Sequence, residues 1–158
     1  MQSIRVMEVE YQSYRISDQT NLLQLDRICA MLATSYWANA RSRETIEKAI
    51  QHSICFGAYS EGVQVGFARC VTDYATIFWL CDVIVDEAYR GRGIGKALME
   101  AVSSHEQLNG LNGILATRDA QGLYAQHGFT VADPGRFMRK PAQMPASVEQ
   151  EKAREPRA

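Results

Sequence analysis

The sequence lacks a charge excess of either sign and lacks a long hydrophobic run. Its 17 lysines and arginines stand against 18 aspartates and glutamates, which gives a net charge of −1 at pH 7. A general nucleic-acid-binding protein normally carries a basic excess, so nucleic acid is not an expected partner. No apolar run approaches the roughly 20 residues that cross a bilayer, and residues 1–6 contain no signal-peptide core. We therefore expect a cytoplasmic protein without a membrane partner.

Cysteine is also scarce, and its spacing does not match the usual metal-binding patterns. The four cysteines are irregularly spaced, without a C-x-x-C pair, at Cys29, Cys55, Cys70 and Cys81. The three histidines likewise lack metal-ligand spacing, and His105 is predicted to lie on a solvated helix face. The sequence therefore predicts free, buried thiols and no metal. No segment repeats another.

Length and composition are those of one globular domain. The chain has 158 residues, and hydrophobic residues make up 46% of it, enough for a substantial core. We expect a leader at residues 1–9 and a single domain at residues 10–139. Residues 140–158 are rich in proline and charge and lack a core-forming pattern, which predicts a flexible tail.

Hydrophobic periodicity predicts an α/β fold of mixed type, with a central twisted sheet of about six or seven strands. The expected strands cover 10–16, 54–59, 63–71, 76–85, 114–117, 129–131 and 137–139. About four helices are expected on the two faces of the sheet, at 22–32, 42–50, 94–102 and 120–127. The helix at 94–102 would lead to the strand at 114–117 as a parallel neighbour of 76–85, by a right-handed crossover.

A glycine-rich loop, Arg90-Gly91-Arg92-Gly93-Ile94-Gly95-Lys96, joins the apolar strand at 76–85 to the next helix. Glycines let a backbone approach an anion closely, and a helix start presents free amides and a positive dipole end to it. The loop therefore predicts a bound phosphate. The order G-x-G-x-G differs from the dinucleotide fingerprint, and Ala97 stands where a nucleoside-triphosphate loop needs Ser or Thr.

Two motifs resemble one known family. Arg90, Gly93 and Gly95 form Arg-x-x-Gly-x-Gly, which resembles the acyl-coenzyme A signature of the Gcn5-related N-acetyltransferase (GNAT) family. Residues 115–129 resemble that family's strand–helix–strand unit ending in "LY…GF", and the resemblance spans roughly 10–139. It implies acetyl-coenzyme A as cosubstrate and direct transfer, in a ternary complex, to the primary amine of a small molecule. Because family members are often dimers, it also implies a candidate homodimer.

The resemblance implies a set of residues that bind acetyl-coenzyme A. Amides of the glycine loop would hold the diphosphate, and free backbone groups of the central strand would pair with the pantetheine arm. Asp119 stands where the family often has Asn, so a helix cap is its alternative role. The expected cofactor-binding residues are Val83, Ile84, Val85, Arg90, Gly91, Arg92, Gly93, Ile94, Gly95, Lys96, Thr117, Asp119 and Tyr124.

Tyr124 and Asp82 are the candidate catalytic residues. Tyr124 matches the tyrosine that protonates the departing sulfur in many family members, and its alternative role is a core tyrosine. Asp82 is a carboxylate inside an otherwise apolar strand, where an unpaired charge is unfavourable. It is either the general base, acting directly or through water, or a structural partner of a backbone amide, an arginine or a tyrosine.

The acceptor would bind beside the first two helices and their linker. Tyr36 and Trp37 in that linker either line a pocket or pack as an aromatic loop, and Arg41 or Arg43 would grasp a carboxylate or phosphate. Asp73 either faces this cleft or serves its hairpin turn. Two other functions stay open. One is acetylation of a protein at a lysine or N-terminus, and the other is a non-catalytic acyl-coenzyme A sensor or interaction module.

Overall fold

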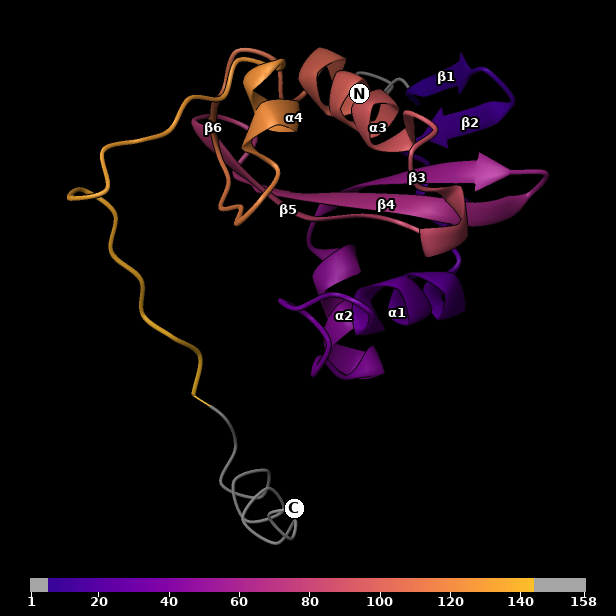
Figure 1. The fold of residues 1–158 in the computed structure, drawn as a ribbon, viewed down its shortest axis with the longest axis horizontal. Helices are drawn as coiled ribbons and strands as arrows, with labels where there is room; N and C mark the ends of the chain where they lie inside the picture. The colour runs from indigo at the N-terminus through magenta and orange to yellow at the C-terminus, as the bar shows by residue number, and fades with distance from the viewer. Residues whose placement is uncertain (1–5, 144–158) are drawn as a thin grey trace, which may run out of the picture.

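The fold is a six-stranded mixed sheet with helices on both faces, in a computed structural model that describes residues 6–143 (Figure 1). The strands are β1 (Glu8–Tyr11), β2 (Tyr14–Ser17), β3 (Ile54–Ser60), β4 (Val63–Thr72), β5 (Ile77–Val85) and β6 (Asn112–Ile114). The helices are α1 (Leu25–Ala33), α2 (Arg43–Gln51), α3 (Ile94–Ser104) and α4 (Gln121–Ala125). The predicted α/β class is confirmed. Within residues 6–143, no helix combines the length and apolar character of a membrane span.

The sheet opens between its last two strands. Strands β1 to β5 are antiparallel neighbours in chain order, and α3 carries the chain across to β6, which is parallel to β5. β5 pairs with β6 only from Ile77 to Trp79. Its remaining stretch, from Leu80 to Val85, faces no strand on that side among the described residues. Within the described part of the chain, this edge of the central strand therefore has no strand partner beside the glycine loop.

The packing of α3 against the sheet fixes the position of the glycine loop. α3 and α4 cover one face of the sheet, and α1 and α2 cover the other (Figure 1). Leu98 of α3 is fully buried against β4, where a Cβ added to Gly66 would lie 3.2 Å from the Leu98 side chain and 3.0 Å from that of Ala58. The absence of a side chain at Gly66 thus lets the helix approach the sheet closely.

A bulge in β5 changes which side chains face which helix layer. Phe78 and Leu80 belong to the core beneath α3, whereas Ile84 belongs to the core beneath α1 and α2. Side chains two residues apart normally share a face, so the alternation must shift between them. The shift occurs at Asp82, whose φ is +55°, opposite a register irregularity between Phe67 and Arg69 of β4. The bulge turns Asp82 toward the α1–α2 side.

The two ends of the domain depart from the prediction. The expected strand at 10–16 is instead the hairpin of β1 and β2, and β1 begins at Glu8, within the predicted leader. The expected strands at 129–131 and 137–139 are absent. A turn closes there with a hydrogen bond from the Arg136 amide to the Asp133 carbonyl. The predicted flexible tail lies mostly outside the described residues.

Two predictions about polar residues had opposite outcomes. Ser42 caps α2, as its position before the helix suggests, by accepting a hydrogen bond from the Thr45 amide at 3.2 Å. The exposed position predicted for His105 is wrong. The His105 ring is buried at the end of α3, where its Nε2 lies 2.9 Å from Oδ2 of Asp18. This pair connects the end of α3 to the loop after β2.

Candidate functional site

The glycine loop presents free backbone amides at the start of α3. Gly91 and Gly93 adopt positive φ angles of 75° and 81°, which few other residues adopt without strain. The first hydrogen bond of α3 runs from the Ala97 amide to the Gly93 carbonyl at 3.0 Å. The amides of the first turn, including those of Gly95 and Lys96, therefore have no acceptor within the helix. This arrangement suits a phosphate group.

The β1–β2 hairpin supports the loop from the side. A Cβ added to Gly93 would lie 2.4 Å from the phenol oxygen of Tyr11, so this tyrosine packs directly over the glycine. Arg92 donates to the Tyr14 hydroxyl at 3.3 Å and its guanidinium lies 5.0 Å from the centroid of the Tyr89 ring. Tyr11 and Tyr14 were not predicted as site residues, because nothing in the sequence places this hairpin beside the loop.

A strip of half-buried side chains leads from the loop toward α4. A Cβ added to Gly95 would contact Leu123 of α4 at 3.9 Å and Val85 of β5 at 4.0 Å. Val83 and Tyr124 pack on the same core as these two side chains. Val83, Val85 and Tyr124 are thus brought to one side of the sheet, whereas the side chain of Ile84 faces the opposite core and only its backbone is available there.

Arg90 and Lys96 place further positive charge at the loop. Both side chains are exposed, and Arg90 Nε donates to the Val85 carbonyl at 3.2 Å. That bond occupies one of the backbone acceptors expected for the pantetheine arm. Ile94, by contrast, is buried as part of the α3 core, so its amide alone can belong to the site.

Tyr124 is held as a neutral phenol. Burial raises its pKa above the ordinary value, and the neighbouring Tyr36 and Asp119 raise the pKa further. A phenol with a raised pKa stays protonated at neutral pH and can donate its proton. The Tyr124 ring packs edge-on against Phe129, with centroids 6.2 Å apart. Tyr36 comes from the α1–α2 linker, and Arg118, in the segment before α4, lies over its ring 3.9 Å from the centroid.

Thr117, rather than Asp119, supports the start of α4. Thr117 Oγ1 accepts a hydrogen bond from the Ala120 amide at 3.0 Å. Ala120 is itself the residue at the helix start, without a side-chain cap, and Asp119 is exposed. The helix-cap alternative for Asp119 is therefore wrong.

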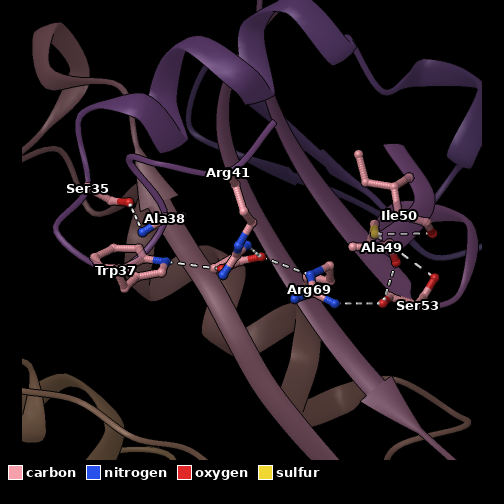
Figure 2. Close-up of polar contacts among 10 residues, drawn as sticks. Ser35, Trp37, Ala38, Arg41, Ala49, Ile50, Ser53 and Arg69 are labelled. Atoms are coloured by element: carbon pink, nitrogen blue, oxygen red, sulfur yellow. Dashed lines mark hydrogen bonds and ion pairs between the residues drawn. The ribbon is translucent and has the colours of Figure 1, made fainter. Parts of the chain in front are cut away.

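Asp82 is buried at the centre of a charge cluster, and Figure 2 labels its partners Trp37, Arg41 and Arg69. Its Oδ1 accepts a hydrogen bond from Trp37 Nε1 at 3.0 Å. Its Oδ2 accepts from Arg41 Nη1 at 2.7 Å and from Arg69 Nε at 2.9 Å. Arg69 also donates to Ser53 Oγ at 3.1 Å. The carboxylate of Asp82 in β5 thus connects the α1–α2 linker to β4. Arg69 was not predicted, although an arginine inside the apolar strand at 63–71 was a usable signal.

The cluster makes Asp82 a weak base. Burial alone would raise the pKa of its carboxyl, but hydrogen bonding and charge from Arg41 and Arg69 outweigh burial and lower that pKa below its ordinary value. Three N–H donors already occupy its oxygens. This geometry favours the structural alternative over the general-base alternative.

Asp73 serves its own turn. The carboxylate accepts hydrogen bonds from the amides of Ala75, Thr76 and Ile77 and from the Thr76 hydroxyl. The Thr76 hydroxyl and these amides lower the pKa of Asp73 well below its usual range. Turn chemistry therefore accounts for this residue. The structure does not bring Asp73 into the Asp82 cluster.

The acceptor candidates form an aromatic wall on the α1–α2 side. The rings of Tyr36 and Trp37 meet edge-on with centroids 5.0 Å apart, and both are partly exposed. Arg118 lies over the Tyr36 ring, 3.9 Å from its centroid. Arg43 instead pairs with Asp26 on an exposed surface. Among residues 6–143, no three His, Cys, Asp or Glu side chains are placed to hold a metal ion.

Comparison with known proteins relates the chain to one enzyme family. A model of the acetyltransferase (GNAT) domain matches residues 51–131. A solved structure of a protein from Xanthomonas campestris belonging to the GNAT family is 41% identical, with a TM-score of 0.79, and the match covers 84% of this chain and 96% of that chain.

Two curated plant relatives are similar at lower identity. GCN5-related N-acetyltransferase 1, chloroplastic, of Arabidopsis thaliana is 30% identical over 139 residues, which are 84% of this chain and 68% of the relative. Histone acetyltransferase TAP1 of Glycine max is 33% identical over 116 residues, 70% of this chain and 46% of the relative. Over the curated relatives, the matched regions make up 42% to 68% of the relatives' own lengths.

Proposed function

Because the chain belongs to the GNAT acetyltransferase family, we propose that it transfers the acetyl group of acetyl-coenzyme A to the primary amine of a small molecule. One observation carries the proposal. The free amides of the positive-φ glycine loop lie at one end of a strip of side chains that leads to a protonated Tyr124. A phosphate site and a proton donor, joined in this way, suit a thioester carried on a diphosphate-containing cofactor.

The residues present fit coenzyme A. The first-turn amides of α3 and the side chains of Arg90 and Lys96 would bind the diphosphate, and the unpaired edge of β5 near Val83 would pair with the pantetheine amides. The bound cofactor would supply an acetyl thioester, whose carbonyl is activated and whose thiolate is a good leaving group.

Tyr124 would donate the proton that the reaction requires at sulfur. The acceptor nitrogen forms a bond to the acetyl carbon while the carbon–sulfur bond breaks, and the phenol proton of Tyr124 passes to the departing sulfur. The amine releases its own proton to water, because the carboxylates of Asp82 and Asp73 are occupied and weakly basic. The Tyr124 phenolate then regains a proton from solvent.

Direct transfer fits the state of the thiol next to Asp82 in the sequence. Cys81 lies beside Asp82 on β5, and burial raises the pKa of its thiol to about 11. A thiol with this pKa is almost entirely protonated at neutral pH, whereas the thiolate is the nucleophile. An acetyl-cysteine intermediate is therefore not part of the proposal.

Release of free thiol from acetyl-coenzyme A tests the proposal. We expect release that depends on added acceptor, measured against a panel of small amines, amino acids and peptides. Turnover on small amines supports the proposal. Acetylation confined to peptides would replace it with protein acetylation, the activity in the name of the soybean relative. Cofactor binding without release on any acceptor would indicate a sensor and contradict it.

A further inference from the structure

The buried charge cluster is not electrically neutral. The carboxylate of Asp82 pairs with Arg41 at 2.7 Å and with Arg69 at 2.9 Å. Within residues 6–143, neither arginine has a second carboxylate at ion-pair distance, so two cations share one anion. The Arg69 side chain is 13% exposed and that of Arg41 is 28% exposed. A ligand therefore reaches the excess positive charge through Arg41.

Asp82 orients Arg41 for binding. A guanidinium carries five N–H donors in one plane, and Asp82 takes one of those on Arg41. The Arg41 amide also donates to the Ala38 carbonyl at 3.1 Å, which fixes the backbone of the linker. The other donors remain for a planar, two-point contact with a carboxylate or phosphate. A side chain fixed in advance loses less conformational entropy when the ligand binds.

A second cation lies at the other side of the aromatic wall. Arg118 stacks on Tyr36 at 3.9 Å, and Tyr36 meets Trp37 edge-on. The indole of Trp37 donates to Asp82, which also holds Arg41. Arg118 therefore flanks the aromatic pair on the Tyr36 side, and Arg41 flanks it on the Trp37 side. No carboxylate within residues 6–143 pairs with Arg118 at ion-pair distance.

The aromatic wall begins beside the segment that carries the proposed proton donor. Tyr36 lies under Arg118 at 3.9 Å, and Arg118 belongs to the segment that leads into α4, the helix of Tyr124. An acceptor lying along Tyr36 and Trp37 would thus have one end beside Tyr124 and the other beside Arg41. A purely cationic acceptor would meet like charge along this path.

We infer that the acceptor is an amine that also carries a carboxylate or phosphate, with its amine near Tyr124 and its anionic group bound by Arg41 and Arg118. This inference rests on the proposed acetyl transfer and specifies the class of its acceptor. Asp82 and Arg69 act as positioning residues, because they hold Arg41 rather than contact the acceptor themselves.

Matched acceptors test the inference. We would measure kcat and KM for thiol release with ω-amino carboxylates and their uncharged amides of equal length, and with aminoalkyl phosphates and the corresponding amino alcohols. A charge-assisted contact predicts that kcat/KM favours each anionic member by about ten- to a hundredfold. The two series also show whether a carboxylate or a phosphate fits better.

Three arginine variants assign the effect. Arg41→Gln and Arg118→Gln should each reduce the preference for the anionic acceptor, mainly through a higher KM. Arg43 pairs with Asp26 on the exposed surface, so Arg43→Gln should leave the preference for the anionic acceptor unchanged. Asp82→Asn should act like Arg41→Gln on KM, as expected for a positioning residue. Because Arg118 is exposed and outside the cluster, its variant keeps the test valid if loss of Arg41 impairs folding.

The outcomes separate the two proposals. Equal kcat/KM for the acceptor with the anionic group and its matched acceptor without that group would overturn the inference. The proposed acetyl transfer to small amines would still stand. An anionic preference that survives both Arg41→Gln and Arg118→Gln would also overturn it. Absence of thiol release with every acceptor would overturn the proposed function itself, and with it this inference.

Discussion

Replacing Tyr124 with Phe should lower kcat by about 10²- to 10⁴-fold, the usual contribution of a positioned proton donor. The phenylalanine keeps the ring that packs against Phe129 and removes only the hydroxyl. Affinity for coenzyme A should change little, because the expected diphosphate contacts come from the glycine loop. Turnover is measured by thiol release at saturating acetyl-coenzyme A, and affinity by calorimetry on the same preparation.

The matched control for this variant is Tyr59→Phe. Tyr59 is a buried tyrosine of β3 whose hydroxyl has no partner within residues 6–143, and it lies outside the proposed site. This control should keep wild-type turnover. Because burial, Tyr36 and Asp119 raise the pKa of Tyr124, deprotonation of this phenol should not lower wild-type activity until the pH exceeds the ordinary tyrosine pKa of about 10. A Tyr124→Phe enzyme that turns over at the wild-type rate would remove the phenol from the mechanism.

Replacing Asp82 with Asn should lower the free energy of unfolding by about 3 kcal/mol, because two arginines then lose their buried counter-ion. We expect the lower end of the range for buried pairs, since Arg41 is 28% exposed. Asparagine tolerates the φ of +55° at this position, so the variant isolates the charge from the backbone conformation. Chemical denaturation at pH 7 measures the difference.

The control for Asp82→Asn is Asp26→Asn, which breaks an exposed ion pair with Arg43. Such a pair contributes about 0–1 kcal/mol. The pH dependence gives a second test. A carboxyl whose pKa is lowered in the folded state stabilises the protein above its unfolded pKa of about 3.9, and this stabilisation is lost as the pH falls through the folded value. The difference between wild type and Asp82→Asn should therefore hold from pH 7 to about pH 4 and shrink below it. If the free energies of unfolding of wild type and Asp82→Asn differ by less than about 1 kcal/mol at pH 7, Asp82 is not the buried counter-ion of Arg41 and Arg69.

The central part of the fold could be predicted because its local signals agree with its packing. The apolar strand at 76–85 is flanked by a turn and a glycine loop, and the observed β5 spans Ile77–Val85. Ser42 precedes α2 as a cap, and the helix begins at the next residue. In both places the residues that define the element are adjacent in the sequence, so no long-range contact was needed to find it.

The ends of the domain could not be predicted, because strands require partners. Residues 129–131 and 137–139 contain strand-forming residues, yet Val131 and Met138 are highly exposed and neither segment pairs. Strand propensity mainly reflects packing against a neighbour, which the sequence does not show. The β1–β2 hairpin was missed for a related reason. Its turn contains Gln12 at a φ of +53° instead of the expected glycine.

The partners of Asp82 depended on a feature that sequence does not reveal. An unbroken β5 would place Asp82 on the same face as Phe78 and Leu80, beneath α3. The bulge turns it to the α1–α2 face, where Trp37 and Arg41 come from a linker more than 40 residues away in the sequence. The sequence could identify Asp82 as unusual. Its role as the centre of a cluster required the structure.

Calorimetric titration of coenzyme A tests the central claim most directly, with wild type, Gly93→Ala and Gly110→Ala compared. A Cβ at Gly93 would lie 2.4 Å from the Tyr11 phenol oxygen at a φ of +81°, so either the loop or the Tyr11 side chain that supports it must shift. Gly110 has a similar φ of +85° with open space around it, so Gly110→Ala introduces the same backbone strain away from the loop. We predict binding to wild type and Gly110→Ala, and affinity at least about tenfold weaker in Gly93→Ala, a loss of about 1.4 kcal/mol. No heat with wild type, or equal affinity in all three proteins, would contradict the assignment of the glycine loop as the cofactor site.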